Sequence, residues 1–159
     1  MSGVYRCRMG DAEALQDQGP LVLGQLTLES RALARARSAG LSVPPRTVHL
    51  LVDTGAATSG IGHDIALSLG LIADEVISVV SVTQTVMRTP VFPASLALWL
   101  EGDGPPRSEL FPLRMVGLPP SRSGAFDGVL GRDFLQRFEL RYFGPDGRFE
   151  LTLRGDAGG

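Results

Sequence analysis

The sequence predicts a mainly β fold in one domain, with one or two short helices. The chain has 159 residues, the usual size of a single domain, and its 43% hydrophobic content is enough to bury a core without disulfides. Apolar residues alternate in several short runs, which is the period of half-buried strands. Clusters of Gly, Pro and Asp separate these runs and mark turns.

The first half of the domain is predicted to contain two strands with a helix between them. The run "PLVLGQLTLES" alternates as a half-buried strand does. In the next run, "SRALARARSAG", Ala and Arg favour a helix, and Gly40 is expected to end it. The run "RTVHLLVD" is apolar on both faces near its end, so we expect a central strand there.

The second half is predicted to contain a short helix and several hairpins. The helix is "GHDIALSLGL", with Gly70 at its end. The stretch 75–100 is rich in β-branched residues and predicts a long hairpin with its tip at Ser81–Thr85, followed by a strand. Further strands are expected in "SELFPLRMVGL" and at the start of "GVLGRDFLQRF", which continues as a short helix. The "GPDG" turn makes "ELRYFGPDGRFELTL" a hairpin.

The ends of the chain are predicted to differ from the domain between them. Residues 1–19 are polar and mixed, and we expect an N-terminal extension that is poorly ordered at its start. The domain is predicted to span residues 20–154. Residues 155–159, "GDAGG", are expected to form a flexible tail.

Composition argues against several classes of function. The net charge is −2 and the 15 basic residues are scattered without interleaved aromatics, so no nucleic-acid partner is expected. No run approaches the ~18 apolar residues of a membrane span, and the N-terminus lacks the apolar region of a secretory signal. We therefore expect a cytoplasmic protein without a membrane partner. The lone Cys7 cannot form an internal disulfide, and His49 and His63 lack partners at metal-ligand spacing, so neither a metal nor a cofactor is expected.

The stretch "HLLVDTGAATSGI" places one carboxylate, Asp53, at the end of the predicted central strand. A charged group there costs free energy unless it is solvated or used. The N–H groups of Gly55 and Ala56 in the following turn can hold the carboxylate by hydrogen bonds. This pattern suits a carboxylate that is held rigidly and faces a cleft.

Hydrolysis by aspartates needs two carboxyls that share one proton, because like charges about 3 Å apart cannot both ionise. No other Asp in the sequence is followed by Thr-Gly or Ser-Gly, and none of the others ends an apolar strand. If Asp53 is half of such a pair, its partner is Asp53 of a second copy, related by a two-fold axis. The sequence therefore predicts a homodimer.

Two motifs together resemble those of retropepsin-like aspartic proteases. The first is "LLVDTGAATSGI", and the second is "DGVLGRDFL", two hydrophobic residues and a glycine before a short helix. The combination is most similar to the small retroviral-type (gag-type) proteases of bacteria, over roughly residues 20–154. The resemblance implies a closed β-barrel acid-protease fold, active as a two-fold dimer, and an endopeptidase that cuts a peptide or protein bound in an extended conformation.

The resemblance also implies roles for individual residues. Asp53 would be the catalytic carboxylate, activating a water that attacks the scissile carbonyl. Thr54 would brace the two active-site loops across the dimer axis, and Gly55 would donate its N–H to the carboxylate. The residues implied to support the site are Thr54, Gly55, Ala56, Val129, Leu130 and Gly131.

The long hairpin between Val76 and Pro93 would be a flap that closes over the substrate. The flap residues implied to contact substrate are Val82, Thr83, Gln84 and Thr85. The tip "SVTQTVM" lacks the glycine that flaps of the family usually carry, so we expect it to be stiffer or differently shaped. The helix-like insert at 31–39 is also extra to the minimal viral form.

Two other functions stay open at the level of sequence. The glycine-free flap tip suggests a retropepsin-like dimer that binds peptides but catalyses weakly. A structural β-domain with no cleft would be a monomer and would not respond to pepstatin-like inhibitors. A serine nucleophile is not indicated, because Ser59 lacks the Gly-x-Ser-x-Gly frame.

Overall fold

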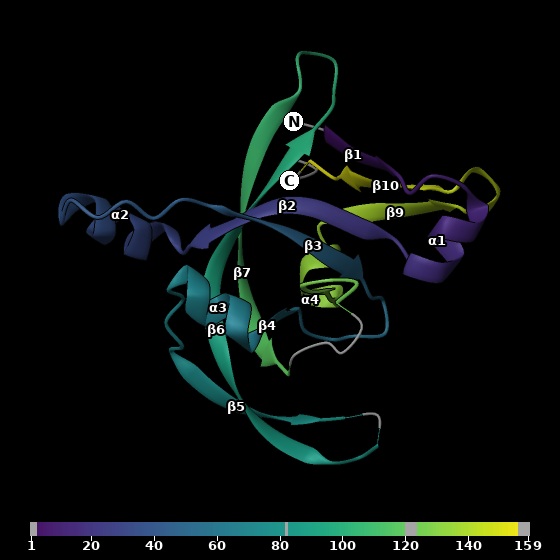
Figure 1. Ribbon diagram of the computed structural model, residues 1–159. Coiled ribbons are helices and arrows are strands. Elements are labelled where there is room, and N and C mark those ends of the chain that lie inside the picture. The colour runs from purple at the N-terminus through teal and green to yellow at the C-terminus, as the bar shows by residue number, and fades with distance from the viewer. Residues whose placement is uncertain (1–2, 82, 120–123, 156–159) are drawn as a thin grey trace.

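The computed structural model describes residues 3–81, 83–119 and 124–155 (Figure 1). The strands are β1 (Gly3–Arg8), β2 (Leu21–Leu28), β3 (Arg46–Val52), β4 (Gly60–Gly62), β5 (Glu75–Val80), β6 (Val86–Leu100), β7 (Arg107–Leu118), β8 (Gly128–Leu130), β9 (Phe138–Phe143) and β10 (Arg148–Leu153). The helices are α1 (Ala12–Gln18), α2 (Ser30–Ser38), α3 (His63–Leu69) and α4 (Arg132–Leu135), with a 3₁₀ turn, η1 (Gly144–Asp146), between β9 and β10.

Six strands close into a barrel in the order β2-β3-β8-β4-β7-β6, and pairing of β2 with β6 completes the closure. The remaining strand of this sheet, β5, pairs with β6 and forms a hairpin that projects from the barrel (Figure 1). The mainly β, closed-barrel class predicted from the sequence is confirmed. The strand that precedes Asp53, β3, lies between β2 and β8, so the predicted central position is confirmed as well.

Apolar side chains fill the barrel because alternate residues of its strands face inward. On β2 and β3, Val22, Leu26, Val48 and Leu50 are fully buried. Burying one such side chain stabilises the fold by about 1.5–3 kcal/mol. The core therefore holds β3 rigidly and fixes the position of the loop that follows it.

The strand β6 is a single strand, where the sequence suggested a hairpin arm followed by a separate strand. Its first part pairs with β5 up to Val91, and its pairing with β2 begins at Ala94. Pro93 lies between these two parts, where one neighbouring strand replaces the other. A proline, which has no N–H to donate, is tolerated at such a position, so β6 continues through it.

Residues 3–18 contain a strand and a helix that the sequence did not predict. The strand β1 pairs with β10 along its whole length, and Tyr5 and Leu15 are buried in the core. The side chain of Asp11 caps α1 by accepting a hydrogen bond from the N–H of Ala14 at 2.9 Å. The predicted tail, 155–159, lies outside the described residues except for Gly155.

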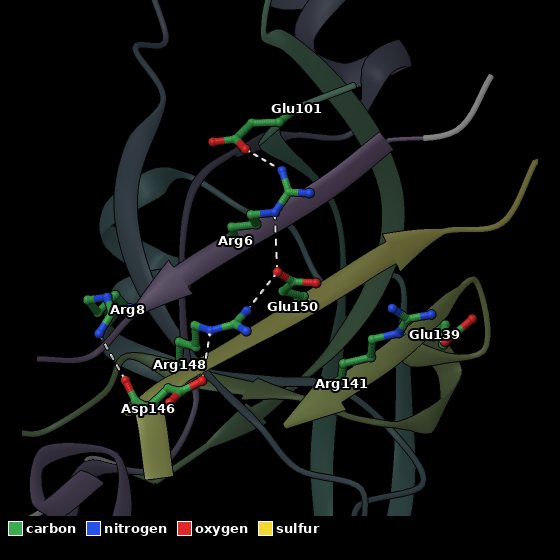
Figure 2. A network of polar contacts seen from close by, with 8 residues as sticks. All are labelled: Arg6, Arg8, Glu101, Glu139, Arg141, Asp146, Arg148 and Glu150. Atoms are coloured by element: carbon green, nitrogen blue, oxygen red, sulfur yellow. Dashed lines mark hydrogen bonds and ion pairs between the residues drawn. The ribbon is translucent and has the colours of Figure 1, made fainter. Parts of the chain in front are cut away.

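A second sheet, with strand order β1-β10-β9, packs beside the barrel. Its outer face is charged, and Figure 2 shows the ion pairs that cross it. Glu150 on the central strand accepts from Arg6 at 3.2 Å and from Arg148 at 2.9 Å. Because β10 has β1 on one edge and β9 on the other, the C-terminal strand has no free edge on which a partner strand could pair.

Tyr5 gives this sheet a pH-dependent link to the barrel. Its hydroxyl accepts a hydrogen bond from the N–H of Leu23 at 2.7 Å, and burial raises the pKa of Tyr5 from 10.0 to about 12. The folded chain then holds this proton more tightly than the unfolded chain does. The stabilisation is complete below pH ~10 and is lost as pH rises towards 12.

We therefore expect the free energy of unfolding to fall between pH ~10 and ~12, with a smaller fall in Tyr5→Phe. Chemical denaturation across this range tests the expectation. All 15 basic residues are arginines, so no lysine titrates in the same window. Equal pH dependence in the two proteins would contradict the role assigned to Tyr5.

Among the described residues, no helix has the length and apolar composition to cross a bilayer.

Candidate functional site

Asp53 follows the last residue of β3, at one end of the barrel. The next strand in sequence, β4, does not pair with β3, because β8 lies between them. The loop 53–59 must therefore pass over the end of β8. The N–H of Asp53 donates to the carbonyl of Leu130, the last residue of β8, at 3.0 Å, which fixes the start of the loop.

The Asp53 carboxylate is held by the backbone that follows it. Oδ1 accepts hydrogen bonds from the N–H of Gly55 at 2.9 Å and from the N–H of Ala56 at 3.2 Å. The side chain is partly exposed, and within the described part of the chain its Oδ2 has no hydrogen-bond partner. One carboxylate oxygen is thus fixed, and the other is available to water or to a second carboxyl.

Arg132 joins the loop to the segment after β8. Its Nη1 donates to the carbonyl of Thr54 at 2.8 Å and to that of Gly55 at 3.0 Å, and its backbone N–H donates to the carbonyl of Ala56 at 2.9 Å. Thr54 is an exposed residue of this loop. The sequence suggested only a helix start near Arg132, so its role as a donor to the loop was missed.

Asp133 and Ser59 form the second connection, which sequence reasoning also missed. The hydroxyl of Ser59 donates to Oδ1 of Asp133 at 2.7 Å and accepts from the N–H of Gly131 at 3.0 Å. The N–H of Ser59 donates to both carboxylate oxygens of Asp133. Ser59 is fully buried, so it holds the far end of the loop and is not placed as a nucleophile. An acidic residue in the first turn of a helix was the available signal, but it does not identify a partner so far away in sequence.

Two glycines, one in β8 and one just after it, allow a close approach to β4 and to the loop 53–59. A Cβ on Gly131 would lie 2.7 Å from the backbone carbonyl carbon of Thr58, and a Cβ on Gly128 would lie 2.2 Å from the carbonyl oxygen of Gly60. Between them, Leu130 is fully buried and Val129 pairs with Leu51. The structure thus brings together the loop residues and the residues of β8 and Gly131 that the sequence singled out.

The hairpin tip lies apart from the loop and makes hydrogen bonds within itself. The N–H of Ser81 donates to Thr85 at 3.0 Å, and the hydroxyls of Ser81 and Thr83 lie 2.7 Å apart. Among the described residues, no hydrogen bond joins Thr83, Gln84 or Thr85 to the Asp53 loop. Val82 lies outside the described residues. In Figure 1 the tip points to the same side of the barrel as the loop after β3.

Gln84 occupies a backbone conformation that usually requires glycine, with φ at +60°. In a three-residue hairpin loop this is the position where glycine is preferred. A non-glycine residue there costs roughly 1–2 kcal/mol. The tip therefore has the shape of a glycine-containing turn without the glycine, which the sequence alone could not show.

Gln84→Gly is expected to keep the fold and to raise the free energy of unfolding by up to about 1 kcal/mol, because glycine removes the backbone cost of the positive φ in this tip. Chemical denaturation measures the change. Gln84→Ala is the matched control, because it removes the side chain but keeps the backbone cost. Equal free energies of unfolding for the two variants would show that the backbone conformation at Gln84 carries no cost.

An ion-pair cluster fixes the base of the hairpin. Arg114 on β7 donates to both carboxylate oxygens of Asp74, at 2.7 and 2.8 Å, and to Glu75 at 2.9 Å. The hydrogen bonds from Arg114 lower the pKa of Asp74. The first residue of β5 is thus tied to a strand that is not its neighbour in the sheet, which restricts movement at the base.

No group of three or more His, Cys, Asp or Glu side chains in the described ranges is placed to hold a metal ion. The absence of a metal or cofactor stays a prediction. The chemistry available at this site is that of a fixed, partly exposed carboxylate.

Comparison with known proteins gives a likeness in fold. No family model matches the sequence, and no curated protein matches it. A crystal structure of a retropepsin-like aspartic protease from Rickettsia conorii matches with a TM-score of 0.52 and 15% sequence identity, over 96% of this chain and 92% of that one. At this identity the likeness shows the fold, and the fold of this chain is therefore retropepsin-like.

Proposed function

We propose that this protein is an aspartic endopeptidase that acts as a homodimer, with Asp53 of each chain in one shared site. The observation that carries the proposal is the Asp53 carboxylate, fixed through Oδ1 by two backbone N–H groups at the end of a central strand. Each chain supplies one carboxylate in this setting, so two chains are needed for an acid–base pair. The retropepsin-like fold supports the same interpretation.

In the proposed mechanism the two carboxyls share one proton. The ionised carboxylate takes a proton from water, whose oxygen attacks the scissile carbonyl carbon, while the protonated carboxyl donates to the carbonyl oxygen. The hydrogen bonds from Gly55 and Ala56 hold the carboxylate in one orientation. Arg132 and the Ser59–Asp133 pair then act as positioning residues, because they hold the loop and do not themselves touch the reacting atoms.

The proposed substrate is an extended segment of a peptide or protein, bound between the Asp53 loop and the hairpin. An extended peptide binds well beside an exposed strand, because its backbone adds hydrogen bonds to the sheet. The hairpin offers apolar surface for side chains, since Val76, Val80 and Val86 are each more than half exposed. The side chains of a bound peptide would pack against these exposed valines.

The test is cleavage of a mixed peptide library by the purified protein across pH ~4–7, followed by mass spectrometry. We expect cuts at internal peptide bonds, an acid-leaning optimum and inhibition by a pepstatin-like compound. Sedimentation of the same sample should show a dimer. A monomer that cuts nothing across this range would contradict the proposal.

A second candidate is a dimeric retropepsin-like module that binds peptides with little catalysis. The observation that favours it is the positive φ of Gln84 in a tip whose hydroxyls bond to one another. Rearrangement of such a tip would break the hydrogen bonds among its hydroxyls. Peptides retained by the protein but uncut across the pH series would favour this candidate.

A further inference from the structure

The insert between β2 and β3 concentrates positive charge on a chain that is acidic elsewhere. Residues 29–45 contain three arginines and one acidic residue, a net charge of +2. The whole chain has a net charge of −2, so the remaining residues together have a net charge of −4. This separation of charge within one domain indicates a surface for an acidic partner.

The helix of this insert, α2, is well formed although it buries none of its residues completely. Glu29 caps its first turn by accepting from the N–H of Arg31 at 2.8 Å. At the other end, Gly40 has φ of +74°, and the N–H of Leu41 donates to the carbonyl of Ala36 at 2.9 Å. Figure 1 shows α2 projecting from the side of the barrel, attached by the two ends of the insert.

Several arginines outside the insert are held by ion pairs, although Arg8, Arg88, Arg132 and Arg137 form none within the described residues. The ion-paired arginines of the second sheet contact Glu150, Glu139 and Asp146 (Figure 2). Among the described residues, by contrast, no ion pair involves an arginine of the insert. The arginines of the insert are Arg31, Arg35 and Arg37. Arg46, the first residue of β3, donates to the hydroxyl of Ser68 at 2.6 Å.

A groove of about 380 Å³ runs between α2 and the segment that joins α3 to β5. Its floor is mainly apolar, and Ile72 at its edge is 80% exposed. Arg35 lines one side, and Asp74 lines the groove at the base of the hairpin. The apolar residues that line the groove are Leu28, Ala32, Ala36, Leu71, Ile72 and Pro93. This volume accommodates one or two apolar side chains.

We propose that α2 and this groove dock an acidic polypeptide segment, with an apolar side chain of the segment in the groove. The arginines attract carboxylates, and the groove gives the apolar side chain a place out of water. A nucleic acid fits less well, because its phosphate backbone offers no apolar side chain to fill the mainly apolar groove. A membrane fits less well, because the exposed residues of α2, such as Ala34 and Ser38, include no large apolar side chain.

The probe is a fluorescein-labelled synthetic peptide of glutamates and aspartates around one central leucine, with binding read by fluorescence anisotropy. The protein is the full chain carrying Asp53→Asn, so that cleavage cannot remove the probe. We expect saturable binding that weakens by about tenfold or more between ~50 and ~300 mM salt. A peptide with every acid replaced by its amide should not bind.

Variants separate the two parts of the surface. The triple change R31E/R35E/R37E is expected to weaken binding by about tenfold or more without altering the circular dichroism spectrum. The single change Arg35→Glu is also expected to weaken binding. Arg8→Glu is its control, since both changes alter the net charge equally and both arginines are exposed. Ile72→Ser should weaken binding of the leucine-containing peptide by a few-fold. It should leave binding of a peptide with a central alanine unchanged.

The proposal is overturned if the triple variant binds the acidic peptide as the parent does, or if Arg8→Glu matters as much as Arg35→Glu. It is also overturned if a single-stranded oligonucleotide or anionic vesicles compete more strongly than the peptide at equal charge. Because the binding assay uses Asp53→Asn, failure of docking and failure of the proposed catalysis are observed in separate experiments.

Discussion

Replacing Asp53 with Asn is expected to abolish peptide cleavage, with a loss of about a thousandfold or more, because the carboxyl pair would have no acid or base left. The fold should be unaffected. The carboxamide oxygen of Asn can still accept the hydrogen bonds that Gly55 and Ala56 donate to Oδ1. Cleavage of a fluorogenic peptide found in the library screen measures the loss, and sedimentation checks that the dimer remains.

Mixing chains tests whether one site needs two molecules. When equal amounts of wild-type and Asp53→Asn chains exchange freely, only about a quarter of the dimers contain two carboxylates. Activity should therefore follow the square of the wild-type fraction. A linear dependence would mean that each chain works alone, and it would remove the basis for a shared site.

The control for both experiments is Asp103→Asn, which makes the same chemical change at an exposed turn between β6 and β7. It should leave cleavage unchanged alone and in mixtures. Cleavage by Asp53→Asn at the wild-type level would contradict the proposed function even if the dimer were present.

Features carried by short stretches of sequence could be predicted. Asp53 was identified because a carboxylate at the end of an apolar strand is costly, and the structure places the expected N–H donors against it. The strand periods of β2 and β3 and the turn at η1 also depend on neighbours in sequence. Each of these needs at most a few adjacent residues to specify it.

Features that depend on distant pairing could not be predicted. Ser59 and Asp133 are 74 residues apart, and nothing near either one identifies the other. The strand β1 was missed for the same reason, since its order comes from pairing with β10 at the far end of the chain. Tyr5 and Leu15 lie among mixed polar and apolar residues with no clear period, and only their burial shows that they belong to the core.

The insert is an intermediate case. The helix at 31–39 was predicted from Ala and Arg content, and α2 at Ser30–Ser38 confirms it. The grouping of its arginines was not recognised, because basic residues that are scattered along the chain can still gather on one surface when acids pair with the others. Helix propensity is local, whereas charge distribution depends on the whole fold.

Gly131→Ala is expected to have the second large effect, on both stability and cleavage. Its backbone, with φ of −88° and ψ of −175°, is acceptable for any residue, so alanine costs nothing through conformation. The cost comes from the Cβ, which would lie 2.7 Å from the carbonyl carbon of Thr58 and 3.0 Å from the carbonyl oxygen of Ala56. Both contacts are with backbone, which cannot move aside as a flexible side chain can.

The loop can relieve this clash only by moving away from Gly131. That movement would stretch the hydrogen bonds that Arg132 and Asp133 make to it, and it would shift the Asp53 carboxylate. We expect a loss of about 2–3 kcal/mol in the free energy of unfolding and a fall in cleavage of about a hundredfold. Gly104→Ala is the control, since a Cβ there meets nothing within 4 Å. If Gly131→Ala has the same free energy of unfolding and the same cleavage activity as Gly104→Ala, the position of the loop does not depend on its close crossing over β8. The rigid positioning of Asp53 would then need another cause.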